Sequence, residues 1–138
     1  MGYSWVLALP LMVITNIKNN FSQSVLEEYG MNKDKNFSSV DSNNTNAVFP
    51  FVFIKLLPSV ENGRDLEGNS INGGLFSFQI TVTDNKNQTN TRKVMTEIVR
   101  IMKRMGFEVI SIPIYEDSKD IHTCTARFRR AIDEGDIL

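Results

Sequence analysis

A cysteine and a histidine two positions apart are the first candidates in this sequence for a catalytic role. Cys124 and His122 fall on one strand-like segment, so alternation places both side chains on the same face. A Cys–His nucleophile needs the thiolate within hydrogen-bond reach of the imidazole, with a third group to orient the base. Cys124 also alternates with the apolar Ala126 and Phe128, which favours a buried, unreactive thiol. Because the chain has one Cys and one His, we expect neither an intrachain disulfide nor a protein-only zinc site.

Three carboxylates form the second candidate cluster. Glu116, Asp117 and Asp120 lie close together just before that segment, and carboxylate oxygens can hold a divalent ion. A solvated turn is the simpler interpretation, and a metal-dependent nuclease is the enzymatic alternative. The sequence has no glycine-rich phosphate loop, nucleophile elbow or metal-ligand spacing. We therefore expect a protein that is not an enzyme and that uses no cofactor and no metal.

Three arginines near the C-terminus raise the question of nucleic-acid binding. Alternation places Arg127 and Arg129 on the polar face of a strand and Arg130 on the other side. Binding of single-stranded nucleic acid on a sheet requires aromatic rings among the cations. The outward face of the most regular strand has none: it carries Ser77, Gln79, Thr81 and Thr83. The net charge of -1 and the pI near 5.8 also lack the basic excess of a nucleic-acid binder. A ferredoxin-like nucleic-acid-binding module stays open as an alternative, and ion pairs to a neighbouring subunit or a solvated face are favoured.

The elements that would position these groups follow from apolar periodicity. A helical stripe predicts a first helix over residues 11–29, with Pro10 in its first turn and Gly30 just past its end. Residues 31–47 are polar and aperiodic, which indicates an exposed linker. The later segments are a strand at 49–57, an acidic glycine-containing loop at 58–74, a strand at 75–83, a helix at 91–105 closed by Gly106, and strands at 109–115 and 121–130.

This order predicts a single α+β domain over residues 1–138. The expected architecture is a four-stranded antiparallel or mixed sheet with two helices packed on one face, in the order α-β-β-α-β-β. The apolar start, residues 5–14, lacks the basic flank and cleavage site of a signal peptide and is too short to span a bilayer. We expect it to pack on its own domain or on a neighbouring subunit, without a membrane.

Several segments resemble small tail-completion proteins of long-tailed bacteriophages, the tail-terminator family. The resemblance covers most of the chain from Phe49 onward, whereas the first helix matches only in kind. The segments that carry it are 49–54 (FPFVFI), 61–67 (ENGRDLE), 71–74 (INGG), 102–107 (MKRMGF) and 126–136 (ARFRRAIDEGD).

The resemblance implies a structural virion protein of the tail or neck, assembled in the host cytoplasm. Such proteins form a homo-oligomeric ring, expected to be a hexamer, on the head-proximal end of the tail tube. The ring would stop tube growth and join the tail tube protein to the head connector proteins. DNA would pass through its lumen without sequence-specific binding. A head-completion or connector-adaptor protein at the same neck junction, bound on the portal side, is the alternative.

The interface residues expected from this resemblance lie in three places. The acidic loop at 61–73 would contact the tube or the adjacent subunit, the arginines would pair with a neighbour's carboxylates, and residues 133–138 would form a terminal arm. The candidates are Glu61, Asp65, Glu67, Arg127, Arg129, Arg130 and Asp136.

Overall fold

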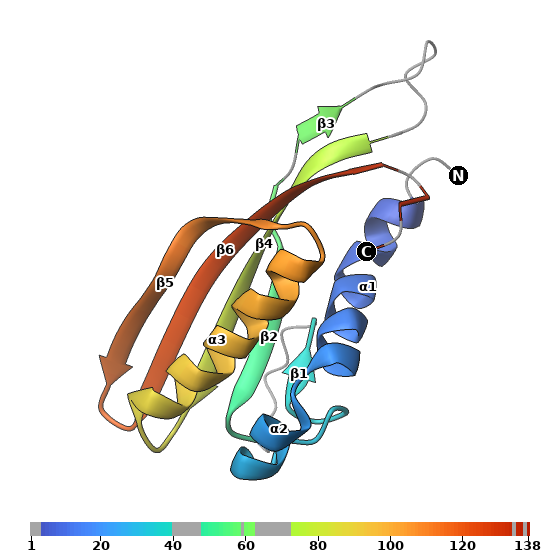
Figure 1. Cartoon of the computed structure of the whole chain (residues 1–138). Coiled ribbons are helices and arrows are strands. Elements are labelled where there is room, and N and C mark those ends of the chain that lie inside the picture. The colour runs from blue at the N-terminus through green and yellow to red at the C-terminus, as the bar shows by residue number, and fades with distance from the viewer. Residues whose placement is uncertain (1–3, 40–47, 59, 63–72, 134, 137) are drawn as a thin grey trace.

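Three helices and a mixed sheet make up the computed structural model, which describes residues 4–39, 48–58, 60–62, 73–133, 135, 136 and 138 (Figure 1). The helices are α1 (Ser4–Asn20), α2 (Gln23–Tyr29) and α3 (Gln88–Arg104). The strands are β1 (Phe37–Ser38), β2 (Phe51–Leu56), β3 (Val60–Asn62), β4 (Gly73–Asp84), β5 (Glu108–Ser118) and β6 (Ile121–Asp133).

The sheet has the order β1-β2-β4-β6-β5, and β3 pairs with the start of β4 off this path. β1 runs parallel to β2, and the other pairs are antiparallel. The α+β class and both antiparallel hairpins are therefore confirmed. The prediction of four strands and two helices is only partly correct. The structure also contains β1 and β3, and it has two helices, α1 and α2, where one was expected.

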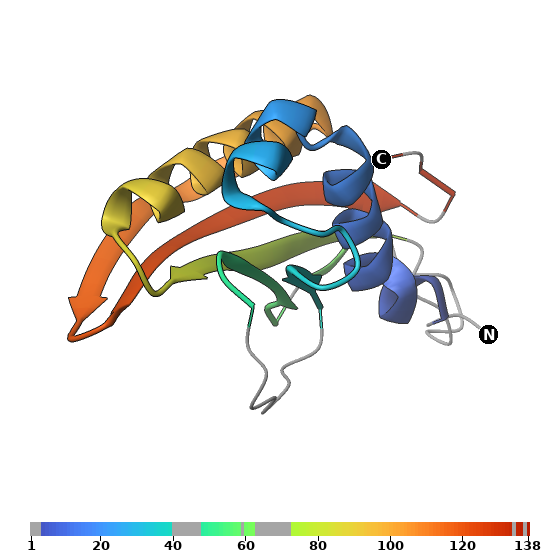
Figure 2. The same cartoon turned by 90° about the horizontal axis from the view of Figure 1, so that it is seen from below.

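The two longest strands, β4 and β6, pair along their whole length in the centre of the sheet. Residues facing the helices are fully buried, as Phe78 and Ile80 are on β4 and Ala126 and Phe128 are on β6. These side chains share one core with the inner faces of α1 and α3. Figure 2 shows α2 and α3 over one face of the sheet, with the opposite face left uncovered by helices.

Helix α3 agrees closely with the sequence prediction because its stripe is regular. Val94, Ile98 and Ile101 are fully buried along one side, and Met102 joins them. The helix begins three residues earlier than expected because the Asn87 side chain accepts a hydrogen bond from the Asn90 backbone amide, which is an N-cap.

Helix α1 contradicts the prediction at its start and its end. Pro10 lies inside the helix, which begins by Ser4, so Pro10 does not mark the first turn. A mid-helix proline removes one hydrogen bond. Apolar packing offsets this cost, since Leu9 is buried and the Trp5 ring meets Phe76 edge-to-face at 5.6 Å. The helix stops before Ser22, whose extended backbone donates to the Glu97 carboxylate at 3.0 Å.

The segment after α2 is also more ordered than the predicted linker. Asn36 is buried, its side-chain amide donates to the Pro50 carbonyl at 2.8 Å, and its carbonyl accepts from the Val52 amide at 2.7 Å. Phe37, in β1, is buried against the Phe21 ring. The prediction of an exposed linker is therefore wrong for Met31 and for residues 36–38, whereas residues 32–35 are exposed as predicted and residues 40–47 lie outside the described part. The sequence did not reveal this packing because Phe37 is preceded by polar residues, Lys35 and Asn36, which are typical of exposed loops.

None of the helices in the described part of the chain is both long and apolar enough to cross a membrane.

Candidate interaction surfaces

An apolar groove runs between α3 and the outermost strand, β5. β5 lies at the end of the sheet and pairs only with β6 among the described strands. The groove has a volume of about 340 Å³. Side chains from both elements line it, including Arg92, Met95, Val99, Lys103, Ile112 and Tyr115. Its apolar floor and cationic rim suit a partner with apolar side chains flanked by acids.

One wall of the groove is held by a cation–π contact. The guanidinium carbon of Arg92 lies 4.2 Å from the centre of the Tyr115 ring, within the range of a favourable contact. Arg92 comes from the first turns of α3 and Tyr115 from β5, so the contact joins the helix to the edge strand. The Tyr115 side chain remains 44% exposed.

β5 is unusual because it exposes apolar residues on both of its faces. Ile112 is 77% exposed, Ile114 55% and Ile110 41%. The register with β6 shifts between Val109 and Ser111 and again between Ser111 and Ile114, so this strand is irregular there. A long edge strand with exposed apolar side chains is a site where a protein pairs with another chain unless it is blocked.

A second exposed apolar surface lies on α1. Leu7 is 79% exposed, Leu11 62% and Met12 41%, while Leu9 and Val13 on the other side of the helix are buried. α1 contacts α3, β1 and β2, so it lies over the end of the sheet opposite to β5 (Figure 1). The sequence predicted an apolar N-terminus packed on its own domain or on a neighbour. One side of α1 packs on its own domain, and the other side faces solvent.

The uncovered face of the sheet holds two of the predicted arginines. The Arg127 Nε donates to the Gln79 Oε1 at 3.0 Å, and Arg129 donates to the Glu108 carboxylate at 3.0 and 3.2 Å. Both arginines therefore have partners within the chain. The Arg129–Glu108 pair is solvent-exposed, and such pairs contribute only about 0–1 kcal/mol.

The third arginine is separate from these two. Arg130 faces the helices, where its Nε would lie 3.3 Å from a Cβ placed on Gly106 at the end of α3. Its Nη1 atom is buried and has no hydrogen-bond partner among the described residues. Arg130 thus packs beneath the end of α3 and does not form one patch with Arg127 and Arg129.

The acidic candidates are only partly described. Asp65 and Glu67 lie outside the described residues. Glu61 belongs to β3, where its backbone pairs with Gly74. Asp136 accepts from the Asp133 backbone amide at 2.8 Å, which makes a local turn at the end of β6.

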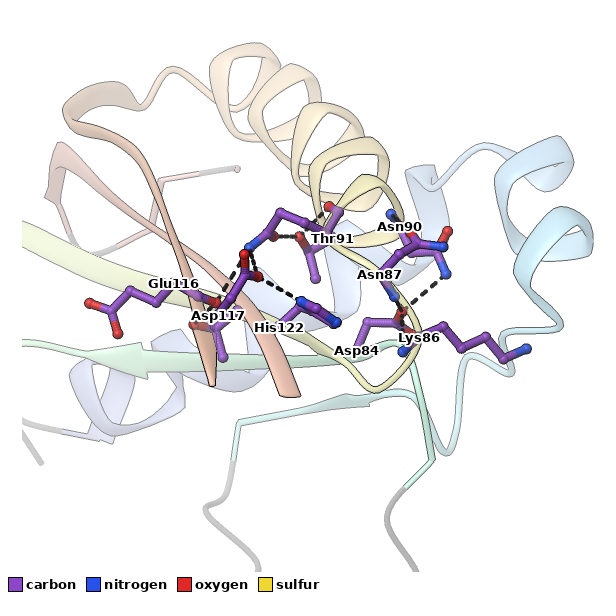
Figure 3. Close-up of polar contacts among 10 residues, drawn as sticks. Asp84, Lys86, Asn87, Asn90, Thr91, Glu116, Asp117 and His122 are labelled. Atoms are coloured by element: carbon purple, nitrogen blue, oxygen red, sulfur yellow. Dashed lines mark hydrogen bonds and ion pairs between the residues drawn. The ribbon is translucent and has the colours of Figure 1, made fainter. Parts of the chain in front are cut away.

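The hairpin between β5 and β6 carries the candidate catalytic and metal-binding residues of the sequence analysis (Figure 3). The Asp117 Oδ1 lies 2.6 Å from His122 Nδ1 and accepts from Gln88 Nε2 at 2.8 Å. The hydrogen bond from His122 is the main cause that holds the pKa of Asp117 below its ordinary value. Figure 3 shows Glu116 pointing away from Asp117, as expected of neighbours on a strand.

Two functions were considered for this hairpin from the sequence, a Cys–His nucleophile and a metal site made of carboxylates. Cys124 is fully buried, and burial raises the pKa of its thiol to about 11, so the thiolate is scarce at neutral pH. Within the described ranges, no group of three or more His, Cys, Asp or Glu side chains is placed to hold a metal ion. His122 forms a hydrogen bond with Asp117, and this bond joins the two strands near the end of the hairpin.

Beside this cluster, Asp84 organises the turn between β4 and α3. Its Oδ2 accepts from the backbone amides of Lys86 and Asn87 and from the Asn90 side chain, each at 3.0 Å (Figure 3). Asp84 is itself buried. The sequence indicated a turn here but did not single out this carboxylate.

The groove was missed from the sequence, whereas an apolar N-terminal segment available to a neighbouring subunit was one of the two expected alternatives. The available signal was that β5 is apolar on both of its faces, at every position from Val109 to Tyr115 except Ser111, although helices cover only one face of the sheet. In comparisons with known proteins, no protein-family model and no curated protein matches this chain.

Proposed function

We propose that this protein is a structural subunit that assembles with copies of itself into a ring, as a phage tail terminator does. The ring would cap the head-proximal end of the tail tube, join it to the head connector and let DNA pass. The observation that carries the proposal is the pair of exposed apolar surfaces at opposite edges of the chain, on β5 and on α1. Apolar patches of this kind mark protein–protein contacts.

The chemistry of the described residues supports an assembly role. The thiol that could act as a nucleophile is buried with its pKa raised, and the histidine near it is bonded to Asp117. The near-neutral charge suits a lumen through which DNA slides, because a basic wall would retain phosphates. We infer the tail tube as the partner from the resemblance of residues 49–54 and 126–136 to tail-completion proteins.

The decisive experiment is native mass spectrometry of the protein alone and after mixing with tail tubes, with electron microscopy of tube length. A ring on one tube end that halts elongation is the expected result. A protein that ignores tubes and binds the portal complex would instead be a connector adaptor at the same junction. A protein that binds neither contradicts the proposal.

The acidic loop can be tested in the same assay. Reversing the charges of Glu61, Asp65 and Glu67 to Lys should block joining to tubes, because the loop is the proposed contact. The matched control is reversal at three exposed acidic residues elsewhere, Asp34, Glu116 and Asp120, which changes the net charge by the same amount. Unchanged joining by the loop variant would show that the loop has no such role.

A further inference from the structure

The two exposed apolar surfaces differ in shape in a way that lets one receive the other. The groove between α3 and β5 is a concave channel with Ile112 and Tyr115 exposed on one wall. The surface on α1 is a convex helical ridge in which Leu7 and Leu11 are four residues apart, hence neighbours on one side of the helix. A helix laid into an apolar groove with anchors at this spacing is a recurrent mode of recognition.

The charges beside the two surfaces are also opposite. Arg92 and Lys103 line the groove. α1 contains no acidic residue, but the end of β6 and the C-terminal segment beside it carry Asp133 and Asp136. Leu138, two residues after Asp136, lies near α1, since the Asn16 Nδ2 is 3.5 Å from the Leu138 carbonyl. Docking of the ridge would therefore bring acids toward the basic rim of the groove.

The positions of the two surfaces determine which kind of oligomer such a contact would form. α1 covers the β1–β2 end of the sheet, and β5 is the last strand at the other end (Figure 1). One chain cannot bring its own ridge to its own groove. A contact between two copies leaves a free groove on one and a free ridge on the other, so further copies can add until the chain of subunits closes.

We propose that the α3–β5 groove binds the Leu7–Met12 ridge of α1 from a second copy of this chain, head to tail. This inference rests on the proposed function, for which it names the subunit interface. It also explains why the apolar N-terminal segment is not fully buried within its own domain.

Two single-lysine variants test the pairing. Leu11→Lys damages only the ridge, and Ile112→Lys damages only the groove; both side chains are mostly exposed, so folding should be preserved, as circular dichroism would check. In sedimentation velocity at the highest concentration the protein tolerates, the wild type should associate and each variant alone should be monomeric. A mixture of the two variants should form dimers and nothing larger, because each dimer joins the intact ridge of one variant to the intact groove of the other. Val48→Lys, at another exposed apolar position, is the matched control and should associate like the wild type.

Other outcomes overturn the inference. A monomeric wild type, a mixture that stays monomeric, or association lost in Ile112→Lys but kept in Leu11→Lys would each exclude the head-to-tail pairing. The last result would instead indicate grooves that pair with each other. Tube capping is scored separately: variants that cap as well as wild type would leave the proposed function standing without this interface. Association in the expected pattern without capping would leave the interface standing without the function.

Discussion

Replacing Asp84 by alanine should destabilise the whole fold, because one buried carboxylate holds the connection between β4 and α3. Its Oδ2 accepts three hydrogen bonds, two from the backbone amides of Lys86 and Asn87 and one from the Asn90 side chain. Bonds to a charged acceptor contribute about 1.5–3 kcal/mol each. Water can reach the exposed turn and replace part of the loss, so we take about 1 kcal/mol for each bond. The expected loss in the free energy of unfolding is therefore about 3 kcal/mol, or roughly 10 °C in Tm for a chain of this size.

Urea unfolding followed by tryptophan fluorescence and far-UV circular dichroism measures this loss. Trp5 is the single tryptophan and packs on Phe76, eight residues before Asp84 on β4, so it reports on global unfolding. Asp84→Asn keeps an acceptor oxygen without the charge and should lose about 1 kcal/mol. Asp120→Ala, at an exposed carboxylate in the β5–β6 turn, is the control and should stay within about 0.5 kcal/mol of wild type. A loss below about 0.5 kcal/mol for Asp84→Ala would refute the view that this carboxylate holds the turn.

Further predictions concern the core, the end of α3 and the hairpin. Phe128→Ala should cost about 3–5 kcal/mol in urea unfolding, because this fully buried ring lies at the centre of the sheet. Gly106→Ala should cost about 1–2 kcal/mol, because φ is +89° there. Cys124 should resist alkylation at pH 8 in the native protein and react on unfolding, since its pKa is about 11; rapid native labelling would contradict its burial. His122→Ala should raise the pKa of Asp117 in an NMR titration. The lowered pKa stabilises the folded state above the ordinary value of 3.8 and this benefit disappears as the pH falls through the folded value, so the variant should differ from wild type near neutral pH but not in strong acid.

Local sequence patterns were enough to predict the elements whose burial is regular. β4 alternates from Gly74 to Asp84, and α3 carries one apolar stripe, so each pattern has a single interpretation. The burial of Cys124 and the outward direction of Arg127 and Arg129 followed from the same alternation. These properties depend only on which side of an element faces the core, and neighbouring residues in the chain reveal that side.

Features that depend on residues far apart in the chain could be seen only in the folded protein. β6 inserts between β4 and β5 through pairs separated by tens of residues, which no local pattern specifies. The helix passes through Pro10 because packing against distant residues outweighs a lost backbone hydrogen bond, and Asn36 becomes a buried junction only because Pro50 and Val52 lie beside it. The two candidate contact surfaces arose in the same way. Leu11 and Ile112 are of residue types that usually lie in the core. They are exposed because α1 and β5 lie at opposite ends of the sheet.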